Sequence, residues 1–168
     1  LRSDSFQGDQ NIVHIMSKMG VKTEFKSDKV QLTSIPVTEI NQNIDFKNCP
    51  DLAQTVMVVA VIKGIKLTMT GLESLKIKET DRVMAMKKEL LKIGGLLNEE
   101  NGIWRLKSGT VPEHLQTIET YEDHRMAMAF APVCMIKATT IRNIEVVKKS
   151  YPGYWAHLKS VGINFNEC

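Results

Sequence analysis

Two short clusters of charged residues are the parts of this sequence best suited to chemistry. They occupy residues 78–82 (KETDR) and 121–125 (YEDHR), and each directly precedes an apolar run with helical spacing. Backbone N–H groups and the positive end of the helix dipole are exposed at a helix entrance. Cationic side chains add to that positive potential, so the two clusters predict the binding of small anions.

The first cluster places a carboxylate between two cations. Lys78 and Arg82 flank Glu79, and two cations favour the charged form of a neighbouring carboxylate. The same cations could clamp an anionic substrate beside it. A purely structural interpretation stays open, in which Thr80 or Asp81 caps the following helix and Glu79 is solvated.

Asp51 and Asp123 stand at the start of two further apolar runs. Either carboxylate could cap its helix, which typically stabilises a protein by about 1 kcal/mol. The residues alone do not separate such a cap from a catalytic carboxylate. His124 and Arg125 could equally lie on a polar surface, and so could the lysine pair at 148–149.

The chain is predicted to contain an internal repeat with an offset of 72 residues, because 81 − 9 and 123 − 51 give the same number. Three pairs share this offset. They are Asp9 and Asp81, Asp51 and Asp123, and Glu73 and Glu145. We therefore expect two related units, near residues 9–75 and 81–147. No linker rich in Pro, Gly or Ser divides them, which predicts a single domain over residues 1–168.

Each copy is predicted to contain an amphipathic helix, a β-hairpin, a buried helix and a short strand, an α/β (α+β) pattern. The first copy has a helix from Asp9 to Gly20, strands at 21–25 and 30–32, a helix over 52–62 and a strand at 65–69. The second has a helix from Asp81 to Gly94, strands at 96–97 and 103–106 around Asn101-Gly102, a helix over 126–136 and a strand at 140–142. Pro132 should kink the last of these helices, and a final helix begins near Tyr154.

Composition excludes several classes of protein. The 168 residues carry a net charge of +3, and no basic run is interleaved with aromatic residues, so a nucleic-acid partner is not expected. The three cysteines lack CxxC spacing, which argues against a zinc site or a disulfide framework and favours a reducing, cytoplasmic environment. No metal, membrane span or signal peptide is expected. The start without Met in mid-pattern suggests part of a longer protein.

The two clusters together resemble the signatures of the 5-enolpyruvylshikimate-3-phosphate synthase family. KETDR at 78–82, DHRMAM at 123–128 and a Lys-Ser-aromatic-Pro segment at 149–152 carry the resemblance, which extends from about Gln7 to Leu158. It implies the inside-out barrel of enolpyruvyl transferases, in which each of two domains contains three βαβαββ units. Two such units would be present here, and the N-terminal domain would be missing.

The resemblance implies catalytic roles for Asp51 and Glu79. Asp51 aligns with the residue that accepts the proton of the 5-hydroxyl of shikimate 3-phosphate. Glu79 aligns with the residue that delivers a proton to the methylene carbon of phosphoenolpyruvate.

It also implies substrate-binding roles for five residues. Lys78 would contact shikimate 3-phosphate, whereas Arg82, Arg125 and Lys149 would contact phosphoenolpyruvate. Arg125 would hold the carboxylate of that substrate, and His124 would line the same pocket.

The implied reaction is transfer of the enolpyruvyl group to the 5-hydroxyl with release of phosphate, in aromatic amino-acid biosynthesis. No cofactor is implied, and a monomer is expected. We expect the chain alone to be inactive, because the other domain would supply one wall of the cleft. The alternatives are a UDP-sugar enolpyruvyl transferase and a non-catalytic anion-binding domain.

Overall fold

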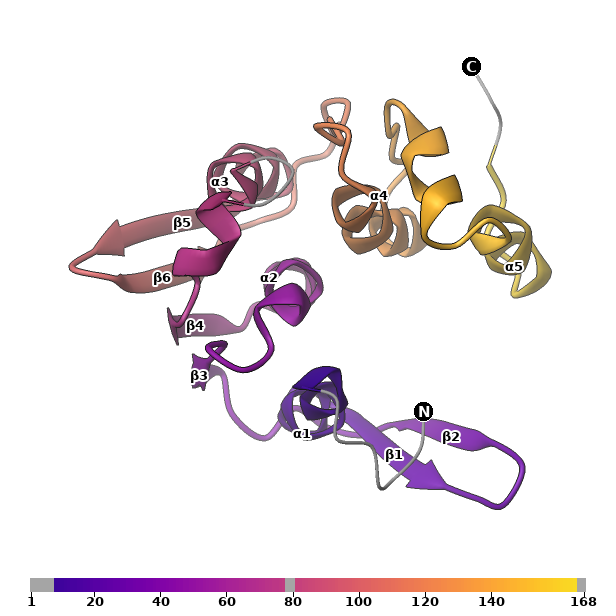
Figure 1. The fold of residues 1–168 in the computed structure, drawn as a ribbon, viewed down its shortest axis with the longest axis horizontal. Coiled ribbons are helices and arrows are strands. Elements are labelled where there is room, and N and C mark those ends of the chain that lie inside the picture. Colours follow the sequence, from indigo (N-terminus) through magenta and orange to yellow (C-terminus); the bar gives the residue numbers. More distant parts are fainter. Residues whose placement is uncertain (1–7, 78–80, 166–168) are drawn as a thin grey trace.

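The computed structural model describes residues 8–77 and 81–165, which contain both helices and strands (Figure 1). The α-helices are α1 (Asn11–Lys18), α2 (Ala53–Lys63), α3 (Arg82–Lys92), α4 (His124–Phe130) and α5 (Tyr154–Ser160). The strands are β1 (Val21–Phe25), β2 (Val30–Ser34), β3 (Asn41–Asp45), β4 (Lys66–Thr70), β5 (Gly95–Glu100) and β6 (Ile103–Ser108). Short 3₁₀ helices are η1 (Gly8–Gln10), η2 (Pro50–Leu52), η3 (Glu73–Ile77), η4 (Ala131–Met135) and η5 (Ile144–Lys149).

The larger sheet joins strands from the two halves of the chain. Its order is β3-β4-β6-β5, with β3 parallel to β4 and the remaining pairs antiparallel. Leu106 on β6 lies opposite Leu67 on one side and Leu97 on the other, and all three side chains are buried. The hairpin of the second half is thereby fixed to the first half. Strands β1 and β2 form a separate two-stranded sheet.

Helix α2 lies at the centre of the core because it is apolar on nearly every side. Most of its residues are buried, and it packs against α4, β4 and β6. Burial of each large aliphatic side chain contributes about 1.5–3 kcal/mol. Gly64, with φ at 70°, ends the helix in the left-handed conformation that glycine adopts without strain. The predicted buried helix at 52–62 is therefore confirmed, with its start one residue later.

Turn and cap residues explain several other predicted elements. The hairpin β5–β6 turns at Asn101 and Gly102, both with positive φ, as expected for this dipeptide. Asp81 caps α3 by accepting a hydrogen bond from the backbone N of Met84. Helix α4 ends at Phe130, and the chain continues as η4 through Pro132, which lacks the N–H that an α-helix needs.

Three predictions of local structure were wrong or incomplete. The first α-helix begins later than predicted, because Asp9 lies within η1 and α1 starts after Gln10. Residues 140–142 form no strand, because Ile141 makes a single parallel bridge with Ile118. Strand β3 was not predicted, since Asn41–Asp45 is mostly polar and forms its strand by pairing with β4.

The end of the described chain packs as a smaller cluster beside the main core. Ala127 and Ala131 meet Val147 and Tyr154 there, so η5 and α5 cover the outer side of α4. The predicted final helix is confirmed as α5. Within the described ranges, no helix is both long and apolar enough to span a membrane.

Candidate active site at three helix entrances

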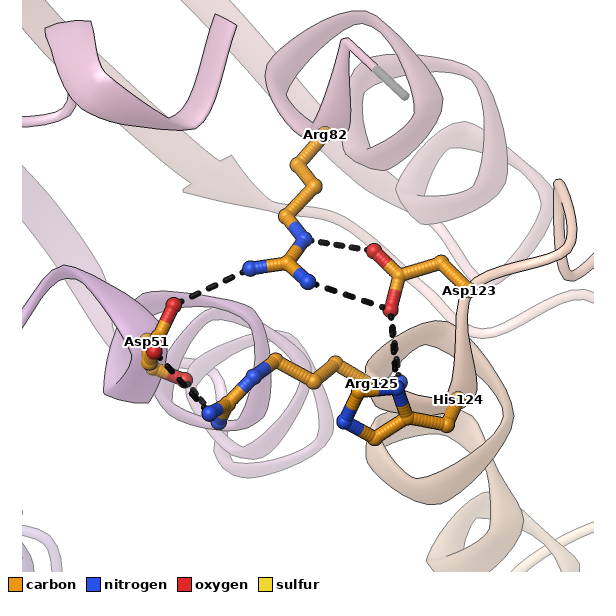
Figure 2. A network of polar contacts seen from close by, with 5 residues as sticks. All are labelled: Asp51, Arg82, Asp123, His124 and Arg125. Atoms are coloured by element: carbon orange, nitrogen blue, oxygen red, sulfur yellow. Dashed lines mark hydrogen bonds and ion pairs between the residues drawn. The ribbon is translucent and has the colours of Figure 1, made fainter. Parts of the chain in front are cut away.

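Asp51 lies in η2, one residue before the N-cap of α2. The N-cap of α2 is Leu52, whose side chain makes no capping hydrogen bond. The Asp51 carboxylate instead forms ion pairs with two arginines. Its Oδ1 is 3.0 Å from Nη1 of Arg82, and its Oδ2 is 2.9 Å from Nη2 of Arg125. The 3₁₀ turn thus leaves this carboxylate free to bridge two guanidinium groups (Figure 2).

Arg82 is the first residue of α3, and its side chain is only 2% exposed. Its Nε donates to Oδ2 of Asp123, and its Nη2 donates to Oδ1 of the same carboxylate at 3.4 Å. This side-on arrangement of guanidinium and carboxylate adds geometric precision to the charge attraction. Arg82 therefore fixes the entrance of α3 against the entrances of both α2 and α4.

Asp123 has two structural tasks at the entrance of α4. Its side chain is fully buried, and its Oδ1 accepts a hydrogen bond of 2.8 Å from the backbone N of Arg125. It is thus the N-cap of α4 as well as the partner of Arg82, as Figure 2 shows. A buried carboxylate is tolerated only with such partners, because desolvation of a charge is costly.

Arg125 and His124 form the more accessible side of the cluster. Their side chains are 32% and 25% exposed. The Arg125 guanidinium extends from α4 to Asp51, where its Nη1 also donates to the backbone oxygen at 3.3 Å. His124 lies at the front of the cluster, with Nδ1 3.8 Å from Oδ1 of Asp123. Arg125 is therefore the cation of this cluster best placed to meet a ligand from solvent.

The cluster suits anion binding and proton transfer more than metal chemistry. Among the described residues, no group of three or more His, Cys, Asp and Glu side chains could hold a metal ion. A separate pocket of about 230 Å³ lies between α1 and β3, lined in part by His14, Lys18 and Asp45. It shares no lining residue with the cluster.

Comparison with known proteins identifies the family. The family described as EPSP synthase (3-phosphoshikimate 1-carboxyvinyltransferase) matches residues 1–158. The chain belongs to the EPSP synthase family. A 3-phosphoshikimate 1-carboxyvinyltransferase of Bacteroides fragilis (strain ATCC 25285) is 41% identical over 94% of this chain and 39% of its own length. One of Methanospirillum hungatei is 34% identical over 100% of this chain and 39% of its own length.

A solved structure supports the fold. The EPSP synthase of Acinetobacter baumannii superimposes with a TM-score of 0.68 at 18% sequence identity, over 92% of this chain and 39% of that one. The predicted α/β architecture of the EPSP synthase family, with units of the inside-out barrel, is therefore confirmed. The chain spans about two fifths of the length of the relatives it matches. The internal repeat and the single domain stay predictions.

The structure brings together four of the seven site residues predicted from the resemblance to EPSP synthases. These are Asp51, Arg82, His124 and Arg125 (Figure 2). Lys78 and Glu79 lie outside the described residues. Lys149 ends η5 as an exposed residue, and no contact found within 8–77 and 81–165 joins it to the cluster.

Sequence reasoning overlooked Asp123 as a site residue and treated it as a cap. A signal for a larger role was present, since Asp123 matches Asp51 at the repeat offset. The reasoning also passed over Glu89, a fully buried carboxylate of α3. Glu89 lies three residues after Met86 on the apolar stripe of that helix, and an acidic residue at such a position calls for a buried partner.

Proposed function

We propose that this chain is part of an enzyme that transfers the enolpyruvyl group of phosphoenolpyruvate to the 5-hydroxyl of shikimate 3-phosphate. The observation that carries the proposal is the Asp51 carboxylate, which lies between Arg82 and Arg125 where three helix entrances meet. Membership of the EPSP synthase family supports the choice of substrates. The family match also favours shikimate 3-phosphate over a UDP-sugar as the acceptor.

Arg125 would bind the carboxylate of phosphoenolpyruvate. Its guanidinium is partly exposed and already holds a carboxylate, that of Asp51, at 2.9 Å. The Asp51 carboxylate accepts from Arg125 through one oxygen only, whereas an incoming carboxylate that replaces it could accept two N–H groups of the guanidinium in bidentate geometry. Arg82 would then keep Asp51 in place through the contact of 3.0 Å to Oδ1.

This exchange would free Oδ2 of Asp51 for chemistry. The released oxygen could accept the proton of the 5-hydroxyl while the new carbon–oxygen bond forms. An aspartate is a weak base toward an alcohol, so the two events should be concerted. The ion pair between Asp51 and Arg125 would thus be the resting form of the site.

The reaction would proceed by addition and then elimination. In the addition, the hydroxyl oxygen bonds to C2 of phosphoenolpyruvate and Glu79 gives a proton to the methylene carbon, which forms a tetrahedral intermediate. In the elimination, the bond from C2 to the phosphate oxygen breaks, and the Glu79 carboxylate takes back a proton from the methyl group as the new double bond forms. Phosphate departs, and the cationic side chains of Lys78, Arg82, Arg125 and Lys149 offset the anionic charge.

Arg82 would act mainly by orientation. Resemblance to EPSP synthases implies a contact with phosphoenolpyruvate, whereas the guanidinium here is 2% exposed and engaged with Asp51 and Asp123. The positive charge of Arg82 can still attract an anionic ligand bound at Arg125 while Arg82 keeps its ion pair with Asp123.

The active enzyme would require sequence beyond this chain. The relatives are more than twice as long, and closure of a second domain would exclude water and complete the binding of shikimate 3-phosphate. We propose that this chain alone is inactive, that the full protein is a monomer, and that it works in the cytoplasm.

The direct test is release of phosphate by the full-length protein. Release that requires both phosphoenolpyruvate and shikimate 3-phosphate supports the proposal, and this chain alone should release none. Binding of anions without release in the full-length protein would favour a non-catalytic anion-binding domain. A requirement for a UDP-sugar in place of shikimate 3-phosphate would contradict the choice of acceptor.

A further inference from the structure

A buried carboxylate ties helix α3 to the segment that leads into α4. Glu89 is fully buried on α3, and its Oε1 accepts a hydrogen bond of 2.7 Å from the hydroxyl of Tyr121. Its Oε2 accepts a hydrogen bond of 3.0 Å from the backbone N of Glu119. Both oxygens of one carboxylate thus contact the chain two to four residues before Asp123.

Lys92 completes this contact one turn later on α3. Its Nζ lies 2.7 Å from Oε2 of Glu89 and donates to the backbone oxygen of Thr117, also at 2.7 Å. The charge of Glu89 is therefore balanced, and residues 117–121 are held at three points. Arg82 holds Asp123 from the other end of the same helix, so α3 fixes both ends of this segment.

The segment between these contacts has an unusual backbone. Tyr121 and Glu122 are consecutive non-glycine residues with φ of 53° and 57°. Residues with side chains adopt this left-handed region at an energetic cost, and it persists only where surrounding contacts enforce it. Asp123 follows at once, and its backbone N bonds to the oxygen of Thr120 at 2.9 Å. The left-handed turn thus determines where the N-cap of α4 begins.

The Tyr121 hydroxyl is the donor in its contact with Glu89. Burial raises the pKa of Tyr121, and the hydrogen bond and negative charge of Glu89 raise it further. The raised pKa favours the protonated hydroxyl, the form that donates to Glu89.

We propose that Glu89 and Tyr121 are positioning residues for the active site: their hydrogen bond fixes the left-handed turn and so places Asp123 and Arg125. This inference rests on the proposed function. A merely stabilising role would make the bond interchangeable with any other buried hydrogen bond. If the bond has a positioning role, loss of the bond should displace Arg125, which lies four residues after Tyr121 in the chain.

Two matched variants of the full-length protein test the inference. Tyr121→Phe removes the hydroxyl that contacts Glu89. Tyr154→Phe removes a comparable hydroxyl on α5, which donates to the backbone oxygen of Met128 at 3.2 Å. Burial raises the pKa of Tyr154 as well, to about 12. Tyr121→Phe should raise KM for phosphoenolpyruvate about tenfold, because small displacements of a binding group are costly. Tyr154→Phe should leave it unchanged.

Amide hydrogen exchange provides a measurement that does not depend on activity. In Tyr121→Phe, and likewise in Glu89→Gln, residues 118–126 should exchange faster, whereas Tyr154→Phe should leave this segment unaltered. If the unmodified protein transfers no enolpyruvyl group, the proposed function fails and hydrogen exchange alone decides the inference. Unchanged exchange of residues 118–126 in Tyr121→Phe would overturn it, as would an unchanged KM in an active protein.

Discussion

The entrances of α2 and α4 carry equivalent aspartates with different environments. Asp51 and Asp123 are 72 residues apart, and each precedes a buried helix. The two helices, α2 and α4, pack against each other. The Asp51 side chain is 27% exposed and caps no helix, whereas that of Asp123 is fully buried and caps α4. Both contact Arg82, so one guanidinium links a carboxylate open to ligand with one sealed inside the fold.

The difference shows how one residue type can stay accessible at one position and serve structure at the other. At α2, the 3₁₀ turn η2 moves Asp51 away from the capping position and directs it toward Arg125. At α4, the left-handed turn at 121–122 places Asp123 directly at the N-cap. Local backbone geometry at the entrance decides which aspartate stays accessible.

Asp123→Ala should produce the largest change. It leaves the buried Arg82 without its main partner and removes the cap of α4. Loss of one member of a buried ion pair typically destabilises by about 3–5 kcal/mol. Urea unfolding of the full-length protein should show this loss. Asp51→Ala is the matched control and should lower the free energy of unfolding by only about 1 kcal/mol. Equal losses would contradict the assignment of Asp123 to structure.

Asp51→Asn should have the next largest effect, on activity rather than on stability. The amide keeps the size of the side chain but cannot serve as a base. Loss of a general base typically slows a reaction about 10²-fold or more. We expect kcat for phosphate release to fall by that factor, with an unfolding midpoint near that of the unmodified protein. A variant that retains most of its kcat would exclude Asp51 as the base.

Arg125→Ala should weaken binding of phosphoenolpyruvate about tenfold, since charge-assisted hydrogen bonds contribute about 1.5–3 kcal/mol. Titration calorimetry on the full-length protein measures this change. Arg105→Ala is a suitable control, because Arg105 is also a partly exposed arginine in an ion pair, with Glu100 on the adjacent strand. If both variants bind equally well, Arg125 does not hold the ligand.

Gln54→Met should sharpen the comparison by making α2 more like α4. Gln54 is fully buried in the first turn of α2, and neither atom of its amide has a hydrogen-bond partner among the described residues. Met126 occupies the matching position of α4 at the repeat offset. An unpaired buried amide costs about 1–3 kcal/mol, so Gln54→Met should raise the unfolding midpoint.

Gln42→Met is the control for this prediction. Gln42 is also buried, but its Nε2 donates to the backbone oxygens of Lys18 and Glu39. Its replacement removes both hydrogen bonds, so the midpoint should fall. The opposite order of the two midpoints would mean that Gln54 has a partner that the described residues do not include.

Local signals in the sequence predicted much of the fold. Asn101-Gly102 predicted a hairpin, and the apolar run after Asp51 predicted the central helix. These signals succeed because turn chemistry and apolar periodicity act over a few residues. Strand β3 escaped prediction because Gln42 faces inward where an apolar residue is usual. Its pairing with β4, about 25 residues away, stabilises it instead.

The candidate site could be predicted only in part for the same reason. The charged motifs identified Arg82 and Arg125, but not how deeply each is buried. The pairing of Arg82 with Asp123 spans 41 residues, and no local pattern reveals it. The contacts of Glu89 with the segment before α4 span 30 and 32 residues, also beyond the reach of a local pattern. Burial and long-range pairing decide which charged residues position the others.

A crystal structure of the full-length protein with phosphoenolpyruvate and shikimate 3-phosphate would test the central division of roles most directly. We predict that the phosphoenolpyruvate carboxylate replaces Asp51 on Arg125, that Asp51 turns to the 5-hydroxyl, and that Asp123 still holds Arg82. A ligand bound away from Arg125, or a complex in which Arg82 leaves Asp123 to bind the substrate, would contradict the account.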